Sequence, residues 1–91
     1  MYGNTMMDEE TVELFSFIKS SPYRLKILKA LKDENKTPTQ LSKEVDTRVF
    51  HVSKILRDFK DNEIAVCVNE KDRMFRYYRL TDKGLSLFKY L

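Results

Sequence analysis

Apolar positions in the first half of the chain recur every three or four residues, which is the period of an α-helix. Three helices are expected there, over residues 8–20, 22–32 and 38–45. The second and third each begin with a hydroxyl residue followed by proline, Ser21-Pro22 and Thr37-Pro38, as is typical of an N-cap and first helical position. Asp8 suits the N-cap of the first helix, and the preceding residues Met1–Met7 are expected to be frayed.

A fourth helix, expected from Arg48 to about Asn62, separates apolar from polar side chains more sharply than the other three. Its apolar stripe consists of Val52, Ile55, Leu56 and Phe59. Its opposite face consists of Phe50, Lys54 and Arg57, flanked by His51 and Ser53. One side of this helix is therefore expected in the core and the other side in solvent.

The period changes after residue 63. Residues 64–69 are mostly β-branched and apolar, and residues 75–80 alternate aromatic or apolar side chains with arginine, so both segments predict strands. The short charged loop Glu70–Met74 joins them, which indicates an antiparallel hairpin. Thr81 then caps a last helix, expected over residues 82–91.

This order of elements predicts a mainly helical α+β fold, a single winged helix-turn-helix domain over residues 1–91. A helix fits the major groove of B-DNA, which is about 12 Å wide, when a preceding helix holds it rigidly. Leu41 and Val45 are expected to pack against Val52 and Leu56, which leaves the cationic side of the fourth helix outward. The hairpin, or wing, carries Lys71, Arg73 and Arg76 toward neighbouring phosphates.

Four segments in this order resemble the ArsR-like and MarR-like regulators, especially the small archaeal ones. Leu41–Phe59 resembles their helix-turn-helix, and Tyr23–Leu31 their second helix. Val66–Asn69 is similar to their first wing strand, and Tyr77–Gly84 (Y-Y-R-L-T-D-K-G) to the junction that closes the wing. The resemblance covers about residues 22–91. It implies a homodimer that binds duplex DNA and regulates transcription.

The chain departs from the pattern of these families at three places. Asp46 stands in the turn where they often have glycine, and Arg73-Met74-Phe75 replaces a common wing glycine. The fourth helix begins with Val49 and Phe50, which cannot read bases through side-chain hydrogen bonds. Phe50 could instead contact a thymine methyl group or be covered by protein.

Charge agrees with a polyanion partner, although the net charge of the 91-residue chain is only +3. Residues 1–47 hold seven Lys/Arg against eight Asp/Glu, a net of −1, whereas residues 48–91 hold ten against six, a net of +4. The half that contains the fourth helix and the wing is therefore the basic half.

Several classes of function lack the residues that they need. One cysteine, Cys67, and one histidine, His51, make a metal site improbable, and the cysteine and histidine clusters of ArsR-like metal sensors are absent. Because no glycine-rich phosphate loop or nucleophile elbow occurs, we expect no cofactor and no enzyme activity. The lone thiol favours a structural cysteine and a cytoplasmic protein, and no apolar run approaches the length of a membrane span.

The residues expected to contact DNA come from the helix-turn-helix and the wing. They are Thr39, Arg48, Val49, Phe50, His51, Ser53, Lys54, Arg57, Lys71, Arg73 and Arg76. Lys54 and Arg57 could alternatively be an ordinary solvated face. Arg76 and Arg79 could pair with Glu70 or Asp82, and one of Tyr77 and Tyr78 is expected to pack on the core.

The first and last helices carry more apolar residues than one buried stripe needs. The expected dimer contacts are Val12, Phe15, Phe17, Leu85, Phe88 and Leu91. The alternative is that the two helices cover each other within one chain. Two other functions stay open: a protein–protein module anchored by Val49 and Phe50, and single-strand binding by the aromatic–arginine strand.

Overall fold

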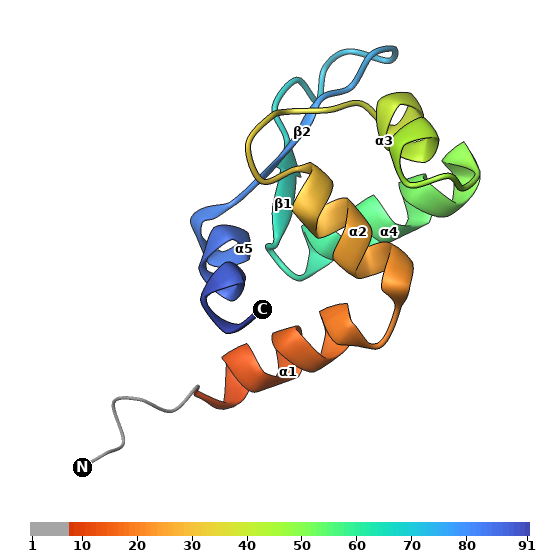
Figure 1. Cartoon of the computed structure of the whole chain (residues 1–91). Helices are drawn as coiled ribbons and strands as arrows, with labels where there is room; N and C mark the ends of the chain where they lie inside the picture. The colour runs from red at the N-terminus through yellow and green to blue at the C-terminus, as the bar shows by residue number, and fades with distance from the viewer. Residues whose placement is uncertain (1–7) are drawn as a thin grey trace.

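Four helices precede a small wing in the computed structural model, which describes residues 8–91 (Figure 1). The expected fraying of Met1–Met7 lies outside the described residues. The helices and strands follow the expected order: α1 (Glu9–Lys19), α2 (Pro22–Ala30), α3 (Pro38–Glu44), α4 (Val49–Asp61), β1 (Ala65–Cys67), β2 (Tyr78–Leu80), α5 (Asp82–Ser86) and the 3₁₀ helix η2 (Leu87–Tyr90). These elements make a winged helix-turn-helix fold.

Helix starts agree with the expected caps. Asp8 Oδ1 accepts a hydrogen bond from the Thr11 N–H at 2.7 Å, which lowers the pKa of the Asp8 carboxyl. Ser21 caps α2 in the same way. Thr37 and Gln40 form a reciprocal capping box at the start of α3, with bonds of 3.2 and 2.8 Å. Each start is therefore set by a side chain next to it in sequence.

Both helices of the helix-turn-helix end in a left-handed residue other than glycine. After α3, Asp46 has φ 56°, and the Thr47 N–H donates to the Ser42 carbonyl at 2.9 Å. After α4, Glu63 has φ 60°, and the Ile64 N–H donates to the Phe59 carbonyl at 2.8 Å. Asp46 thus adopts a backbone conformation that favours glycine, because Asp tolerates that region better than most residues.

The wing strands are paired in the antiparallel direction as expected, but they are shorter. Ala65 pairs with Leu80, and Cys67 pairs with Tyr78. The expected strands 64–69 and 75–80 were too long, because a side-chain-closed loop replaces the ladder between Val68 and Tyr77. Lys36, in the connection before α3, makes two backbone hydrogen bonds with Tyr78, of 3.1 and 2.8 Å. This bridge, which periodicity did not predict, fixes the wing against the start of α3.

The core lies between the helices and the base of the wing. Its buried apolar residues are Leu14, Ile18, Ile27, Leu28, Leu31, Leu41, Val45, Val52, Ile55, Leu56, Phe59, Ile64, Ala65, Leu80 and Leu87. The expected packing of Leu41 and Val45 with Val52 and Leu56 is confirmed, since all four belong to this cluster. Tyr78 packs against the core and Tyr77 is exposed, as the strand alternation predicted.

A close approach joins the wing to the last helix. The Thr81 hydroxyl accepts a hydrogen bond from the Gly84 N–H at 3.0 Å and itself donates to the Glu63 carbonyl. A Cβ on Gly84 would lie 2.3 Å from the Ile64 carbonyl oxygen. The Thr-x-x-Gly spacing is therefore a packing requirement at this junction.

The last helix is not continuous, contrary to expectation. It is α-helical only from Asp82 to Ser86, and η2 follows. A tightened final turn of this kind is common at helix ends, and here it accompanies the burial of Leu87. Helix α1 packs on η2 within the chain, at the end of the molecule opposite the wing loop (Figure 1).

Candidate nucleic-acid interface

The outward side of α4 carries free cations. Lys54 and Arg57 are exposed, and among residues 8–91 neither forms an ion pair or a side-chain hydrogen bond. Arg48, Val49 and Ser53 are exposed beside them, while the inward stripe is buried. An unpaired cation keeps its full charge available for a phosphate or a base edge.

His51 differs from the other predicted contact residues because the chain itself holds it. Its Nδ1 lies 3.1 Å from the Thr47 hydroxyl, and its ring meets the Tyr23 ring edge-on at 5.0 Å between centroids. The side chain is half-buried. These contacts anchor the start of α4 to α2 and leave only part of the imidazole accessible.

The end of α4 is tied to the wing instead of being free. Lys60 Nζ lies 2.8 Å from Glu70 Oε1. This hydrogen bond and the opposite charge raise the pKa of Lys60 and lower the pKa of Glu70. The alternative in which Arg76 or Arg79 pairs with Glu70 or Asp82 is not found among residues 8–91, where Lys60 is the ion-pair partner of Glu70.

The wing loop is closed by the side chain of Asn69, which was not among the residues predicted from the sequence. Its Nδ2 donates to the Asp72 carboxylate at 2.8 Å and to the Phe75 carbonyl at 3.0 Å. Its Oδ1 accepts from the Tyr77 N–H at 2.8 Å. An asparagine at the start of a loop is a signal for this kind of turn. The loop is thereby held as a defined shape.

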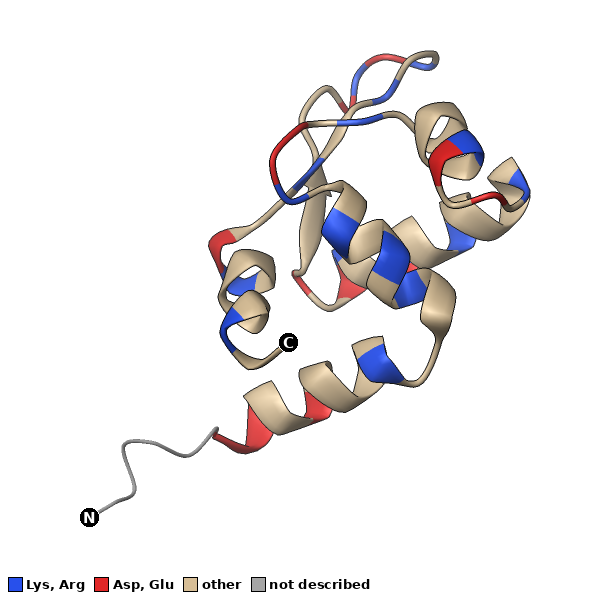
Figure 2. Ribbon diagram, in the orientation of Figure 1, with Lys and Arg blue, Asp and Glu red and all other residues tan. Residues whose placement is uncertain are grey.

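Cations also line the wing. Lys71, Arg73 and Arg76 are exposed, and Arg76 Nε donates to the Asp72 carbonyl at 2.6 Å. Figure 2 shows basic residues on the wing and the outer helices, whereas α1, at the far end, begins with acidic residues. Basic residues also lie on α2 and on α5 and η2, next to α1, so the charge difference between the two halves of the sequence is not a clean separation in space (Figure 2).

A groove of about 610 Å³ runs between the starts of α3 and α4 and the wing. It is lined by Thr37, Pro38, Thr39, Gln40, Val49, Ser53, Arg73, Met74, Phe75, Arg76 and Tyr77. The structure thus brings Thr39, Val49, Ser53, Arg73 and Arg76, which were predicted from separate segments, to one surface. Phe50, 82% exposed, is the most exposed large apolar residue of the described chain.

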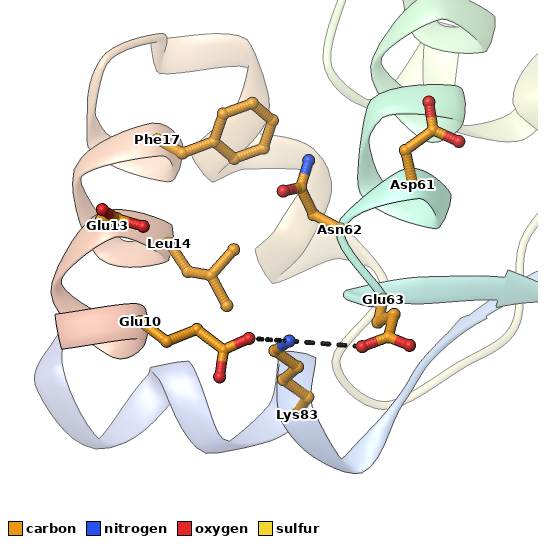
Figure 3. Close-up of a pocket in the computed structure, with 8 residues that line it drawn as sticks. All are labelled: Glu10, Glu13, Leu14, Phe17, Asp61, Asn62, Glu63 and Lys83. Carbon is orange, nitrogen blue, oxygen red and sulfur yellow. Dashed lines mark hydrogen bonds and ion pairs between the residues drawn. The ribbon is translucent and has the colours of Figure 1, made fainter. Parts of the chain in front are cut away.

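A second hollow, of about 290 Å³, lies at the other end of the molecule beside α1 (Figure 3). It is lined by Glu10, Glu13, Leu14, Phe17, Asp61, Asn62, Glu63 and Lys83. Lys83 forms ion pairs with Glu10 and with Glu63, and the hydrogen bond to Glu10 raises the pKa of Lys83. Carboxylates outnumber cations in the lining of this hollow, and their negative charge disfavours phosphate binding there. Among residues 8–91, no three His, Cys, Asp or Glu are grouped to hold a metal ion.

The predicted dimer residues divide into two groups. Val12, Leu85 and Leu91 are exposed. Phe17 and Phe88 pack against the core of their own chain, and Phe15 is half-buried. The Phe17 ring lies edge-on to Phe59, 6.3 Å between centroids, under the Arg24 guanidinium. The exposed group, together with Tyr90, leaves an apolar surface on α1, α5 and η2.

Solved structures share this fold at low sequence identity. The homodimeric winged helix-turn-helix DNA-binding domain of a possible ArsR-family regulator from Mycobacterium bovis matches with a TM-score of 0.71 and 18% identity, over 98% of this chain and 84% of that one. HlyU from Vibrio cholerae matches with a TM-score of 0.72 and 17% identity, over 98% and 91%. A mutant MepR from a multidrug-resistant S. aureus isolate matches with a TM-score of 0.56 and 17% identity, over 94% and 56%.

These likenesses establish the winged helix fold. No protein-family model matches the chain, and no curated protein sequence is similar to it. None of the helices described in residues 8–91 is long and apolar enough to cross a membrane.

Proposed function

We propose that this protein binds duplex DNA as a homodimer and regulates transcription, in the manner of ArsR-like and MarR-like regulators. The observation that supports the proposal is that Arg73 and Arg76 of the wing line one groove with Val49 and Ser53 of α4. Lys54 and Arg57 are exposed on the same helix, outside the groove lining. The fold is that of solved DNA-binding domains. Two further points remain predictions: that the chain is of the small archaeal type of regulator, and that it is cytoplasmic.

In this proposal α4 enters the major groove and the wing lies on the flanking backbone. Lys54 and Arg57 donate hydrogen bonds to base edges or phosphates, with Arg48, His51 and Ser53 beside them. Val49 and Phe50 contact thymine methyl groups. The phosphate contacts come from Thr39, Lys71, Arg73 and Arg76. We expect the chain to act by binding alone, without catalytic residues, a cofactor or a metal ion.

Salt dependence tests duplex binding. The affinity for random duplex is expected to fall steeply as salt rises, because each neutralised phosphate releases counterions. Arg73→Ala should weaken all sequences alike and reduce the slope of log affinity against log salt by about 1. Fluorescence anisotropy at several salt concentrations measures both effects.

The matched control is Lys29→Ala, which removes the same charge from an exposed position on α2 outside the groove. It should leave the slope as in the parent. A parent with weak, salt-independent binding would refute duplex binding, and equal slopes for the two variants would remove Arg73 from the interface.

A dimer is proposed through the apolar surface of α1, α5 and η2. We expect the parent to sediment as a dimer and Leu85→Glu as a folded monomer, since Leu85 is exposed and a charge there disrupts an apolar interface without entering the core. Val68→Glu, at an equally exposed apolar position on the wing, is the control and should remain dimeric. A parent that is monomeric at high micromolar concentration contradicts this part of the proposal.

A protein–protein module is the second candidate, favoured by the exposed Phe50. It predicts little affinity for random duplex at low salt. The salt experiment therefore separates the two candidates.

A further inference from the structure

Two neighbouring large apolar side chains stand exposed on the wing. Met74 is 69% exposed and Phe75 is 71% exposed. Both line the groove on its wing side, across from Val49 on α4. Adjacent apolar residues held in solvent beside a groove are typical of a contact surface.

The backbone presents this pair in a defined position. Phe75 has φ 56°, a left-handed conformation that aromatic residues rarely adopt. The Asn69 amide holds the Phe75 carbonyl at 3.0 Å and the Tyr77 N–H at 2.8 Å, so hydrogen bonds flank the strained residue on both sides. The wing therefore carries the two side chains on a closed loop.

The charged residues around Met74 and Phe75 favour an anionic binding partner. Arg73 and Arg76 directly flank the pair, and Lys71 is exposed on the same loop. Of the two carboxylates of the loop, Glu70 is paired with Lys60, whereas Asp72 accepts a hydrogen bond from the Asn69 amide and keeps its charge, so the three cations still outnumber it. An apolar tip within a cationic rim fits a polyanion whose interior is apolar, and the stacked bases of duplex DNA between two phosphate strands have this arrangement.

We propose that Met74 and Phe75 form a wedge that enters the minor groove and partly unstacks one base step, so that the bound DNA is kinked. This inference rests on the proposed duplex binding and adds a mode of contact to it. Apolar wedges act in this way in architectural DNA-binding proteins. Pyrimidine–purine steps unstack most readily, so the wedge favours a TA or CA step under the wing.

Binding to pre-distorted DNA tests the wedge without knowledge of the operator. Two duplexes are compared: one is fully paired, and the other has the same base pairs with two extra unpaired nucleotides inserted in one strand. The parent is expected to bind the bulged duplex about 10-fold tighter, because the bulge has already unstacked a step. The double variant Met74→Ala, Phe75→Asn should lose this preference. Asparagine is chosen at 75 because it tolerates the left-handed backbone.

The matched control is Val68→Ala. Val68 is 46% exposed on the wing and does not line the groove, so this variant should keep the parent's preference. A paired duplex with 2-aminopurine at a TA step gives a second readout: its fluorescence should rise on binding of the parent and of Val68→Ala, and not with the double variant.

Two results would overturn the wedge while leaving duplex binding intact: equal affinity of the parent for both duplexes, or an undiminished preference in the double variant. Loss of the parent's dimer in the double variant would overturn it too, by assigning the pair to a protein contact. Absence of any salt-dependent duplex binding would refute the proposed function itself, and the wedge with it.

Discussion

Replacement of both Lys54 and Arg57 by alanine is expected to weaken binding to a duplex selected from random sequence by about 2–6 kcal/mol, if the two losses add. Both side chains are exposed on α4 and make no ion pair among the described residues. Their removal therefore takes away DNA contacts and leaves the core stripe of the helix intact. Anisotropy titrations measure the affinity, and thermal melting checks that the fold is unchanged.

Lys60→Ala provides the control on the same helix. Lys60 carries the same charge as Lys54, but Glu70 holds it at 2.8 Å, so it has less to offer a phosphate. The effect of Lys60→Ala on DNA affinity should be clearly smaller. If the double variant at 54 and 57 binds the selected duplex as well as the parent does, α4 is not the recognition helix.

Gly84→Ala is expected to destabilise the fold by about 3 kcal/mol. The new methyl group would meet the Ile64 carbonyl oxygen at 2.3 Å, and that oxygen already accepts a hydrogen bond from the Thr81 N–H at 2.9 Å. Relief of the clash needs movement of α5 away from the start of β1. The better helix propensity of alanine, worth about 1 kcal/mol, offsets only part of this loss.

Thermal melting followed by circular dichroism measures the effect. For a domain of this size the loss corresponds to a melting temperature roughly 10–25 °C below that of the parent. Ser86→Ala, on the same short helix, removes one hydroxyl and should change stability by less than about 1 kcal/mol. Melting of Gly84→Ala within a few degrees of the parent would show that the junction can open, and that Gly84 has no packing role.

The features of this protein that follow from its sequence are those set by local chemistry. Asp8, Ser21 and Thr37 cap the helices that follow them, and each reaches a backbone N–H three residues away. The two sides of α4 follow from the helical period, which depends only on spacing. The order of elements, the buried stripe of α4 and the exposure of its cations could therefore be predicted from the sequence alone.

The wing shows why the rest could not be predicted in this way. Its strands end early because Asn69 bonds to residues three to eight positions away, and its base is held by Lys36, which precedes Tyr78 by a whole helix-turn-helix. The partner of Glu70 proved to be Lys60, ten residues earlier, and not a neighbouring arginine. Each of these contacts joins two segments that the fold brings together, and the spacing of residues along the chain does not predict which segments become neighbours.

The helix caps and the two faces of α4 were thus predictable from the sequence alone. A turn of helix brings side chains three or four positions apart into contact whatever surrounds the helix. The groove, the closed wing loop and the partial burial of Phe17 and Phe88 emerged only from folding. They arise where α3, α4 and the wing, or α1 and η2, pack together, and that packing depends on the shape of the whole core.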